Sequence, residues 1–149
     1  FDVEVLVFDK YLKNFGNSFI KETDMEEIFK RTHILSLHIP LSEDTYKLVD
    51  LPFLQSFKNK IILINTSRGK IVDIESLLKL LKNAKLAGAC LDVLEDEDIS
   101  EGFSTNNLWF KELIELQNVI LTPHIAGWTF ESKQRIGEVL LSKIRELSY

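Results

Sequence analysis

The sequence predicts an α/β protein, a parallel sheet doubly wound by helices, and two observations lead to this prediction. Apolar runs typical of strands alternate along the chain with segments of helical periodicity, the pattern of a parallel sheet covered by helices. Residues 61–64 (Ile-Ile-Leu-Ile) are apolar without interruption, as in a strand buried on both faces of such a sheet. We therefore expect functional residues at the strand ends, because ligands of open α/β sheets lie beyond the carboxyl ends of the strands.

The expected elements follow from these patterns. We expect strands at residues 3–8, 33–39, 61–64, 86–91 and 119–122, and a short edge strand at 18–21. We expect helices at residues 25–31, 52–57, 74–83, 108–116 and 130–147, and an irregular loop at 99–107. Asp24, Asp73 and Thr129 stand where an N-cap residue accepts a hydrogen bond from the first turn of a helix.

Length, charge and cysteine usage narrow the function classes. A chain of 149 residues matches one domain with a sizeable core. Its net charge of -5 and its lack of a basic run argue against nucleic acid as the main partner. The single cysteine, Cys90, lies in an apolar strand pattern, so we expect neither a disulfide framework nor a metal site, and a cytoplasmic protein. No apolar run reaches membrane-spanning length, so we expect no membrane partner.

Five predicted strands each have, at or just beyond their carboxyl end, a residue that can do chemistry: Asp9, His38, Arg68, Asp92 and His124. If the strands are parallel, these residues share one edge of the sheet. Taken singly, each has a plainer interpretation as a solvated group in a polar loop, and for Asp9 or Arg68 alone that interpretation is the better one. Five such residues at five strand ends are much harder to explain by chance.

Arg68, Glu97 and His124 together make a sensible catalytic set. An arginine presents a planar fork of donors to a carboxylate and polarises a neighbouring carbonyl. A histidine exchanges a proton near neutral pH. Glu97 can hydrogen-bond the second ring nitrogen of the histidine, fix its tautomer and favour its protonated form. Asp9, at the end of the first strand, stands where a dinucleotide-binding sheet holds the hydroxyls of an adenosine ribose.

Four segments resemble the signature segments of the D-isomer-specific 2-hydroxyacid dehydrogenases, which include phosphoglycerate, glycerate and D-lactate dehydrogenases. They are residues 36–41 (Ser-Leu-His-Ile-Pro-Leu), 65–69 (Asn-Thr-Ser-Arg-Gly), 92–97 (Asp-Val-Leu-Glu-Asp-Glu) and 122–127 (Thr-Pro-His-Ile-Ala-Gly). They occur in the family's order over nearly the whole chain. The resemblance implies a Rossmann-like NAD-binding domain. It also implies an oxidoreductase that transfers a hydride between NAD(H) and a D-2-hydroxy acid or its 2-keto acid.

The resemblance also implies a role for each residue. Arg68 would bind the substrate carboxylate, His124 would be the acid/base and Glu97 its partner. Asp9 would bind the adenosine ribose and favour NAD over NADP. The other cofactor contacts would come from residues along the same edge: His38, Thr66, Ser67, Arg68, Asp92, His124 and Gly127. The implied partners are a small 2-hydroxy acid and, in the intact protein, a second copy in a homodimer.

Two departures from the family pattern change the expected domain. Asp98 stands where the family usually has proline, which alters the loop but leaves the Glu97 carboxylate in place. The chain opens at Phe1 almost directly in a strand and contains no Gly-x-Gly. We therefore expect residues 1–149 to be a partial NAD-binding domain that lacks its first strand, its glycine-rich loop and the separate substrate-binding domain. The missing strand would lie between residues 3–8 and 33–39, so these two strands should not pair directly.

A non-enzymatic alternative stays open. Corepressor relatives use the same fold to sense NAD or to bind a partner, and they can retain the catalytic side chains. The acidic net charge and the absence of a basic tract favour the enzyme. The fragment alone is expected to be inactive, and the sequence leaves open which hydroxy acid is used.

Overall fold

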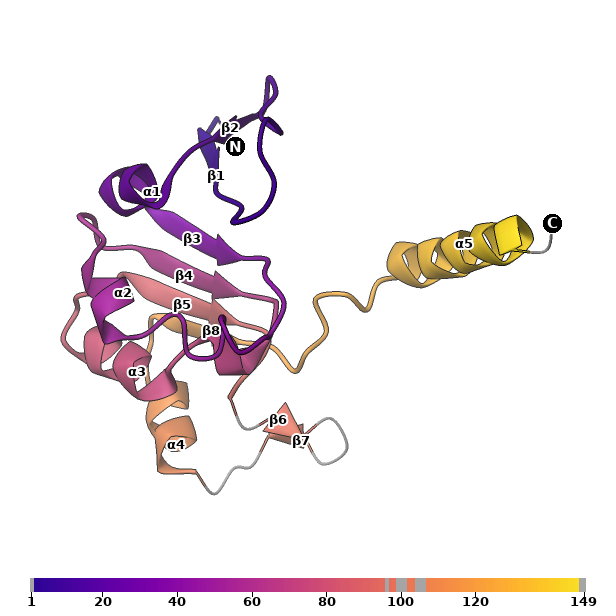
Figure 1. The fold of residues 1–149 in the computed structure, drawn as a ribbon. Helices are drawn as coiled ribbons and strands as arrows, with labels where there is room; N and C mark the ends of the chain where they lie inside the picture. The colour runs from indigo at the N-terminus through magenta and orange to yellow at the C-terminus, as the bar shows by residue number, and fades with distance from the viewer. Residues whose placement is uncertain (1, 96, 99–101, 104–106, 148–149) are drawn as a thin grey trace.

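The computed structural model describes residues 2–95, 97–98, 102–103 and 107–147 (Figure 1). Its centre is a four-stranded sheet in the order β3 (Ile34–Leu37), β4 (Ile62–Asn65), β5 (Gly88–Leu91) and β8 (Val119–Leu121). All neighbouring pairs in this sheet are parallel. The predicted fold class, an α/β protein with a parallel sheet flanked by helices, is confirmed. Strands β3, β5 and β8 are three, two and one residues shorter than predicted, whereas β4 has the predicted length and begins one residue later.

Helices α2 (Leu51–Gln55), α3 (Ile74–Lys82) and α4 (Leu108–Ile114) pack with the buried face of the sheet into one core. The strand residues of this core alternate along their strands, and Leu37, Leu63 and Leu91 are at most 7% exposed. The opposite face carries Ile34 and Ile120, which are 57% and 63% exposed. The helices therefore cover the face that carries Leu37, Leu63 and Leu91, and the hydrophobic core lies between that face and the helices.

Aspartates begin three of the helices. Asp24 accepts a hydrogen bond from the amide of Glu27 at the start of α1 (Met25–Arg31), and Asp73 accepts one from Ser76 at the start of α3. Both caps were predicted. Asp50 is a third, accepting from Phe53 at 2.9 Å. Helix α2 therefore begins at Leu51, one residue before the start that we predicted at Pro52.

The first strands form a small sheet of their own. Strand β1 (Val5–Val7) pairs in parallel with β2 (Ile20–Glu22), and this pair is separate from the four-stranded sheet (Figure 1). The absence of a direct β1–β3 pair among the described residues agrees with the prediction for residues 3–8 and 33–39. An ion pair between Lys10 and Asp44, 2.7 Å apart, joins the loop after β1 to the loop after β3.

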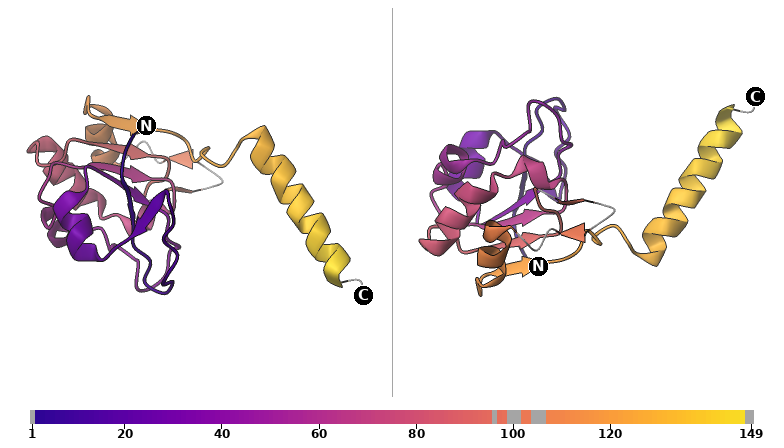
Figure 2. Two further views of the ribbon diagram at one scale, coloured as in Figure 1. Left: turned by 90° about the horizontal axis from the view of Figure 1, so that it is seen from above. Right: turned by 90° about the horizontal axis from the view of Figure 1, so that it is seen from below.

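The chain ends in helix α5 (Phe130–Leu147), which points away from the body of the molecule (Figures 1 and 2). The predicted cap is confirmed, because Thr129 Oγ1 accepts a hydrogen bond from the amide of Ser132 at 3.0 Å. Its apolar stripe is exposed, with Ile136 at 58% and Ile144 at 59%. Across the described residues, no helix combines the length and apolar character that crossing a membrane requires.

A short antiparallel pair, β6 (Glu97–Asp98) and β7 (Gly102–Phe103), follows β5. Most of the irregular loop expected at 99–107 lies outside the described residues. The backbone of Glu97 is described in β6, whereas its side chain lies outside what the structure describes. The predicted role of the Glu97 carboxylate therefore stays a prediction.

Candidate active site

The carboxyl ends of the four parallel strands bring four of the predicted residues to one edge of the sheet. His38 follows β3 directly and Asp92 follows β5 directly, while Arg68 and His124 each lie three residues beyond β4 and β8. Asp9 lies two residues beyond β1, in the small sheet. Its carboxylate accepts hydrogen bonds from the amides of Leu12 and Tyr11, which hold the pKa of Asp9 below its usual value.

Asn65 organises the turn that carries Arg68. Its side chain is 1% exposed, donates to the carbonyl of Arg68 at 3.0 Å and accepts from the amide of Ser67 at 3.0 Å. The hydroxyl of Ser67 then donates to the carbonyl of Leu37 at 2.5 Å, which ties this turn to the end of β3. Both the NH₂ group and the oxygen of this buried side-chain amide are hydrogen-bonded. This fixes the loop, because breaking either bond would leave a buried polar group without a partner.

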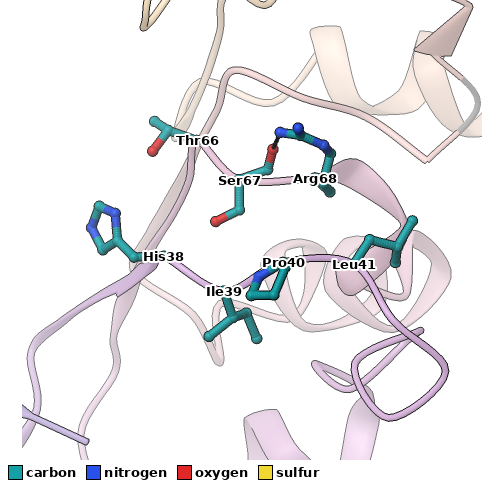
Figure 3. A pocket seen from close by; sticks show the side chains of 7 residues that line it. All are labelled: His38, Ile39, Pro40, Leu41, Thr66, Ser67 and Arg68. Carbon is teal, nitrogen blue, oxygen red and sulfur yellow. Dashed lines mark hydrogen bonds between the residues drawn. The ribbon is translucent and has the colours of Figure 1, made fainter. Parts of the chain in front are cut away.

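A cleft of about 440 Å³ lies between the ends of β3 and β4 (Figure 3). One wall is Thr66, Ser67 and Arg68, and the other is residues 38–41. Arg68 is exposed, and its guanidinium donates to the carbonyl of Ser67 at 2.7 Å, the dashed bond of Figure 3. This leaves most of the guanidinium donors for a ligand. The exposed ring of His38 pairs with the hydroxyl of Ser36 at 2.8 Å.

A second, more apolar cavity of about 340 Å³ shares Thr66 with this cleft. Residues at three strand ends line it: Ile64, Cys90, Leu91, Asp92, Ile120, Thr122, Ile125 and Ala126. Neighbouring polar and apolar cavities at the same sheet edge suit a ligand with a charged part and a flat apolar part.

Asp92 holds the turn that carries His124. The carboxylate is in a residue only 4% exposed. It accepts hydrogen bonds from the Thr122 hydroxyl at 2.5 Å and from the amides of Ile125 and Ala126 at 2.9 Å each. Its carbonyl accepts from the amide of His124 at 2.9 Å. One side chain therefore fixes residues 122–126.

These bonds set the protonation of Asp92. Burial alone raises the pKa of this carboxyl. The hydrogen bonds from Thr122, Ala126 and Ile125, with the charge of His124, outweigh burial and leave the pKa of Asp92 below its ordinary value. The ionised form therefore stabilises the folded turn. That contribution is complete above the unfolded pKa of about 3.9 and is lost as the pH falls through the lower folded value.

We predict that Asp92→Asn destabilises the protein by about 1–3 kcal/mol at pH 7, because the new NH₂ would point a donor at amide donors. The free energy of unfolding in urea at pH 7 and at pH 3 measures this, and the difference from wild type should shrink at pH 3. Asp44→Asn is the control, because Asp44 is exposed and the change removes one ion pair that water screens. Equal losses in the two variants at pH 7 would contradict the role of Asp92.

His124 lies in a strained backbone conformation. Its φ of 54° is in the left-handed region, which non-glycine residues rarely adopt. Its amide is held by the carbonyls of Asp92 and Thr122, at 2.9 and 3.0 Å. Strain that the surroundings hold in place is typical of functional sites. Gly127, three residues on, is exposed, and a Cβ there would meet nothing within 4 Å.

The backbone after Arg68 passes very close to the segment after β5. A Cβ at Gly69 would lie 1.9 Å from the carbonyl oxygen of Leu94 and 2.0 Å from its carbonyl carbon. Both neighbours are main-chain atoms that cannot rotate away. Glycine is therefore required here for close approach.

We predict that Gly69→Ala lowers the free energy of unfolding by about 1–3 kcal/mol or more, the cost of overpacking. Gly137→Ala, in exposed helix α5, is the matched control: no atom lies within 4 Å of its Cβ, and alanine should stabilise the helix by up to about 1 kcal/mol. Urea unfolding of the two variants measures both effects. Similar stabilities would show that the close contact is not required.

Three residues of this edge were missed in the sequence. In the sequence, Asn65 looks like an ordinary polar turn residue, Thr122 like the polar end of the last strand, and Lys47 like a solvated loop lysine. A polar residue at the end of an apolar strand run is the signal that could have found Asn65. Lys47 had no local signal, because its partners are 26 and 48 positions away. Within the described part of the chain, no three His, Cys, Asp or Glu residues are placed to hold a metal ion.

A parallel α/β sheet with charged, hydroxyl and amide groups at its carboxyl edge defines the class of proteins that bind nucleotides and small ligands there. Residues 1–126 match the family model described as D-isomer specific 2-hydroxyacid dehydrogenase, NAD binding domain. The chain belongs to this family of NAD-dependent D-2-hydroxyacid dehydrogenases, and the resemblance seen in the sequence is confirmed.

Individual relatives agree. The chain is 37% identical to a glyoxylate reductase of Thermofilum pendens over 93% of this chain and 40% of that protein. It is 38% identical to D-3-phosphoglycerate dehydrogenase 1 of Saccharomyces cerevisiae over 76% of this chain and 25% of that protein. The crystal structure of an NAD-complexed D-isomer specific 2-hydroxyacid dehydrogenase from Lactobacillus delbrueckii superposes with a TM-score of 0.85. It is 30% identical, over 97% of this chain and 45% of that one. The chain thus spans less than half the length of these relatives.

Proposed function

We propose that this chain is the catalytic, cofactor-binding part of a longer oxidoreductase. That enzyme transfers a hydride between NAD(H) and a D-2-hydroxy acid or its 2-keto acid. The observation that carries the proposal is the joint placement of Arg68, Asp92 and His124 beyond the ends of neighbouring parallel strands, held by main-chain bonds. The family and the similarity to glyoxylate reductases and to D-lactate dehydrogenase structures support it.

Each residue has a part in the proposal. The Arg68 guanidinium uses one N–H donor for the carbonyl of Ser67 and binds the substrate carboxylate with its other donors. His124 donates a proton to the keto oxygen in reduction and removes it from the hydroxyl in oxidation. Glu97 hydrogen-bonds the imidazole and favours its protonated form. The enzyme needs imidazolium for reduction and neutral imidazole for oxidation.

The described residues fit the nicotinamide and ribose ends of NAD. Bound NAD supplies a hydride acceptor or donor at its nicotinamide. Asp92 accepts three hydrogen bonds, and a carboxylate has about four acceptor positions, so one remains for an amide. Thr66, Ser67, His38 and Gly127 border the same edge. Asp9 would accept hydrogen bonds from the ribose hydroxyls and repel the 2′-phosphate of NADP.

The test is the rate of NADH oxidation by the full-length protein with glyoxylate, pyruvate and an aromatic 2-oxo acid, with NADPH as the second cofactor. We expect turnover of at least one keto acid, a preference for NADH, and oxidation of the D-hydroxy acid but not its L-isomer. The 149-residue chain alone should not turn over, because it contains no Gly-x-Gly to cradle a pyrophosphate. Tight NADH binding without turnover of any keto acid would support the non-enzymatic alternative instead.

A further inference from the structure

Lys47 joins two carboxylates from different parts of the chain. Its Nζ lies 3.0 Å from Asp73 Oδ1 and 2.9 Å from Glu95 Oε1. The carboxylate side chains are only 21% and 14% exposed, and the lysine 36%. These bonds raise the pKa of Lys47 above its usual value, with Glu95 contributing most. The cluster is therefore better shielded from water than an ordinary surface ion pair.

The three members of this cluster surround the turn that carries Arg68. On one side, the amide of Lys47 donates to the carbonyl of Lys70 at 2.8 Å, and Val49 pairs with Val72 as an isolated bridge. On the other side, Gly69 lies against the backbone of Leu94, next to Glu95. Residues 68–73 are thus clamped between residues 47–49 and 94–95. Lys47 belongs to the first of these segments, and its ammonium binds both Asp73 of the clamped turn and Glu95 of the second segment.

The backbone of Lys47 shows that its placement has a cost. Its φ of 49° is in the left-handed region, which a lysine adopts only at an energetic cost. The amide bond to Lys70 and the two ion pairs offset that cost. Without the cation, Asp73 would keep its bond from Ser76, but Asp73 and Glu95 would be two neighbouring negative charges partly out of water.

We propose that Lys47 is a positioning residue, which holds the turn of residues 68–73 so that the Arg68 guanidinium meets the substrate carboxylate. This inference rests on the proposed function. Lys47 lines neither cavity, so it acts through the turn rather than on the ligand. A small displacement of a bidentate arginine weakens the bonds to a planar carboxylate, because both of them depend on its orientation.

The test compares Lys47→Met and Lys47→Arg in the full-length protein. We expect Lys47→Met to raise the KM for the keto acid on the order of tenfold and to leave the Kd for NADH within about twofold. Lys47→Arg keeps the cation, so its KM for the keto acid should stay close to that of wild type. The control is Lys82→Met, which removes a similar ion pair, 2.8 Å to Glu112, far along α3 and should leave KM unchanged.

The outcomes separate the two proposals. A fall in melting temperature with an unchanged KM in Lys47→Met would overturn the positioning role and leave Lys47 purely structural. If wild type turns over no keto acid, the proposed function fails, and hydrogen exchange then decides on the clamp itself. The amides of Ile71, Val72 and Asp73 should exchange faster in Lys47→Met than in wild type or Lys82→Met. Unchanged exchange there would overturn the clamp.

Discussion

Replacing His124 by asparagine should lower turnover of the keto acid by about 10²–10⁴-fold, the usual contribution of a positioned proton donor. The turn itself should survive, because asparagine is among the residues that best tolerate a φ of 54°. The amide bonds to Asp92 and Thr122 are main-chain bonds and do not depend on the imidazole. NADH binding should therefore stay close to that of wild type.

Steady-state rates in both directions and the Kd for NADH measure this prediction. His33→Asn serves as the comparison, since His33 is exposed just before β3, at the opposite edge of the sheet from residue 124. It should affect turnover far less than the change at residue 124. Should His124→Asn keep wild-type turnover, the acid/base would have to be another group.

Replacing Arg68 by lysine should lower kcat/KM for the keto acid by about 10–100-fold. An ammonium cannot reproduce the bidentate fork, and a charge-assisted hydrogen bond contributes about 1.5–3 kcal/mol. KM should rise and kcat should fall, because in the proposed function the guanidinium both binds the carboxylate and polarises the carbonyl. The Asn65 bond should persist, since Asn65 binds the carbonyl of residue 68 rather than its side chain.

Initial rates over a range of keto acid concentrations, at saturating NADH, measure the split between KM and kcat. Arg135→Lys is the matched control, because Arg135 lies on exposed helix α5 and pairs with Glu138 three residues on. A rise in KM for both variants would point to a general effect of arginine loss. An unchanged KM in Arg68→Lys would remove Arg68 from carboxylate binding.

Much of this edge could be predicted from the sequence because its signals are local. An apolar run followed by Arg68 or Asp92 is visible within ten residues, and so are the caps Asp24 and Asp73. The parallel order of β3, β4, β5 and β8 follows from the helical segments between them. The separation of β1 from β3 was expected from the family resemblance rather than from any local pattern.

The rest depends on contacts between distant residues. The sequence predicts that Asp92 contacts the cofactor. The structure adds that its carboxylate accepts hydrogen bonds from two amides 33 and 34 residues away along the chain. The left-handed backbone of His124 could not be predicted, because even histidine, which is enriched in this region, adopts it in only a minority of cases. Lys47 needed the fold to bring Asp73 and Glu95 to one point.

The sheet ladder continues past the strands into the active site. The amide of Asp92 donates to the carbonyl of Asn65, the amide of Thr122 to Leu91, and the amide of His124 to Asp92, all at 2.9–3.0 Å. The alignment of these segments thus follows from backbone register together with the Asp92 side chain, and apolar core side chains affect it by keeping the sheet folded. Conservative changes at core positions such as Leu63 should accordingly alter how many molecules are folded more than where Asp92 and His124 lie in each folded molecule. Over evolutionary time, the apolar core of this domain can drift in sequence without moving the residues at the edge of the sheet.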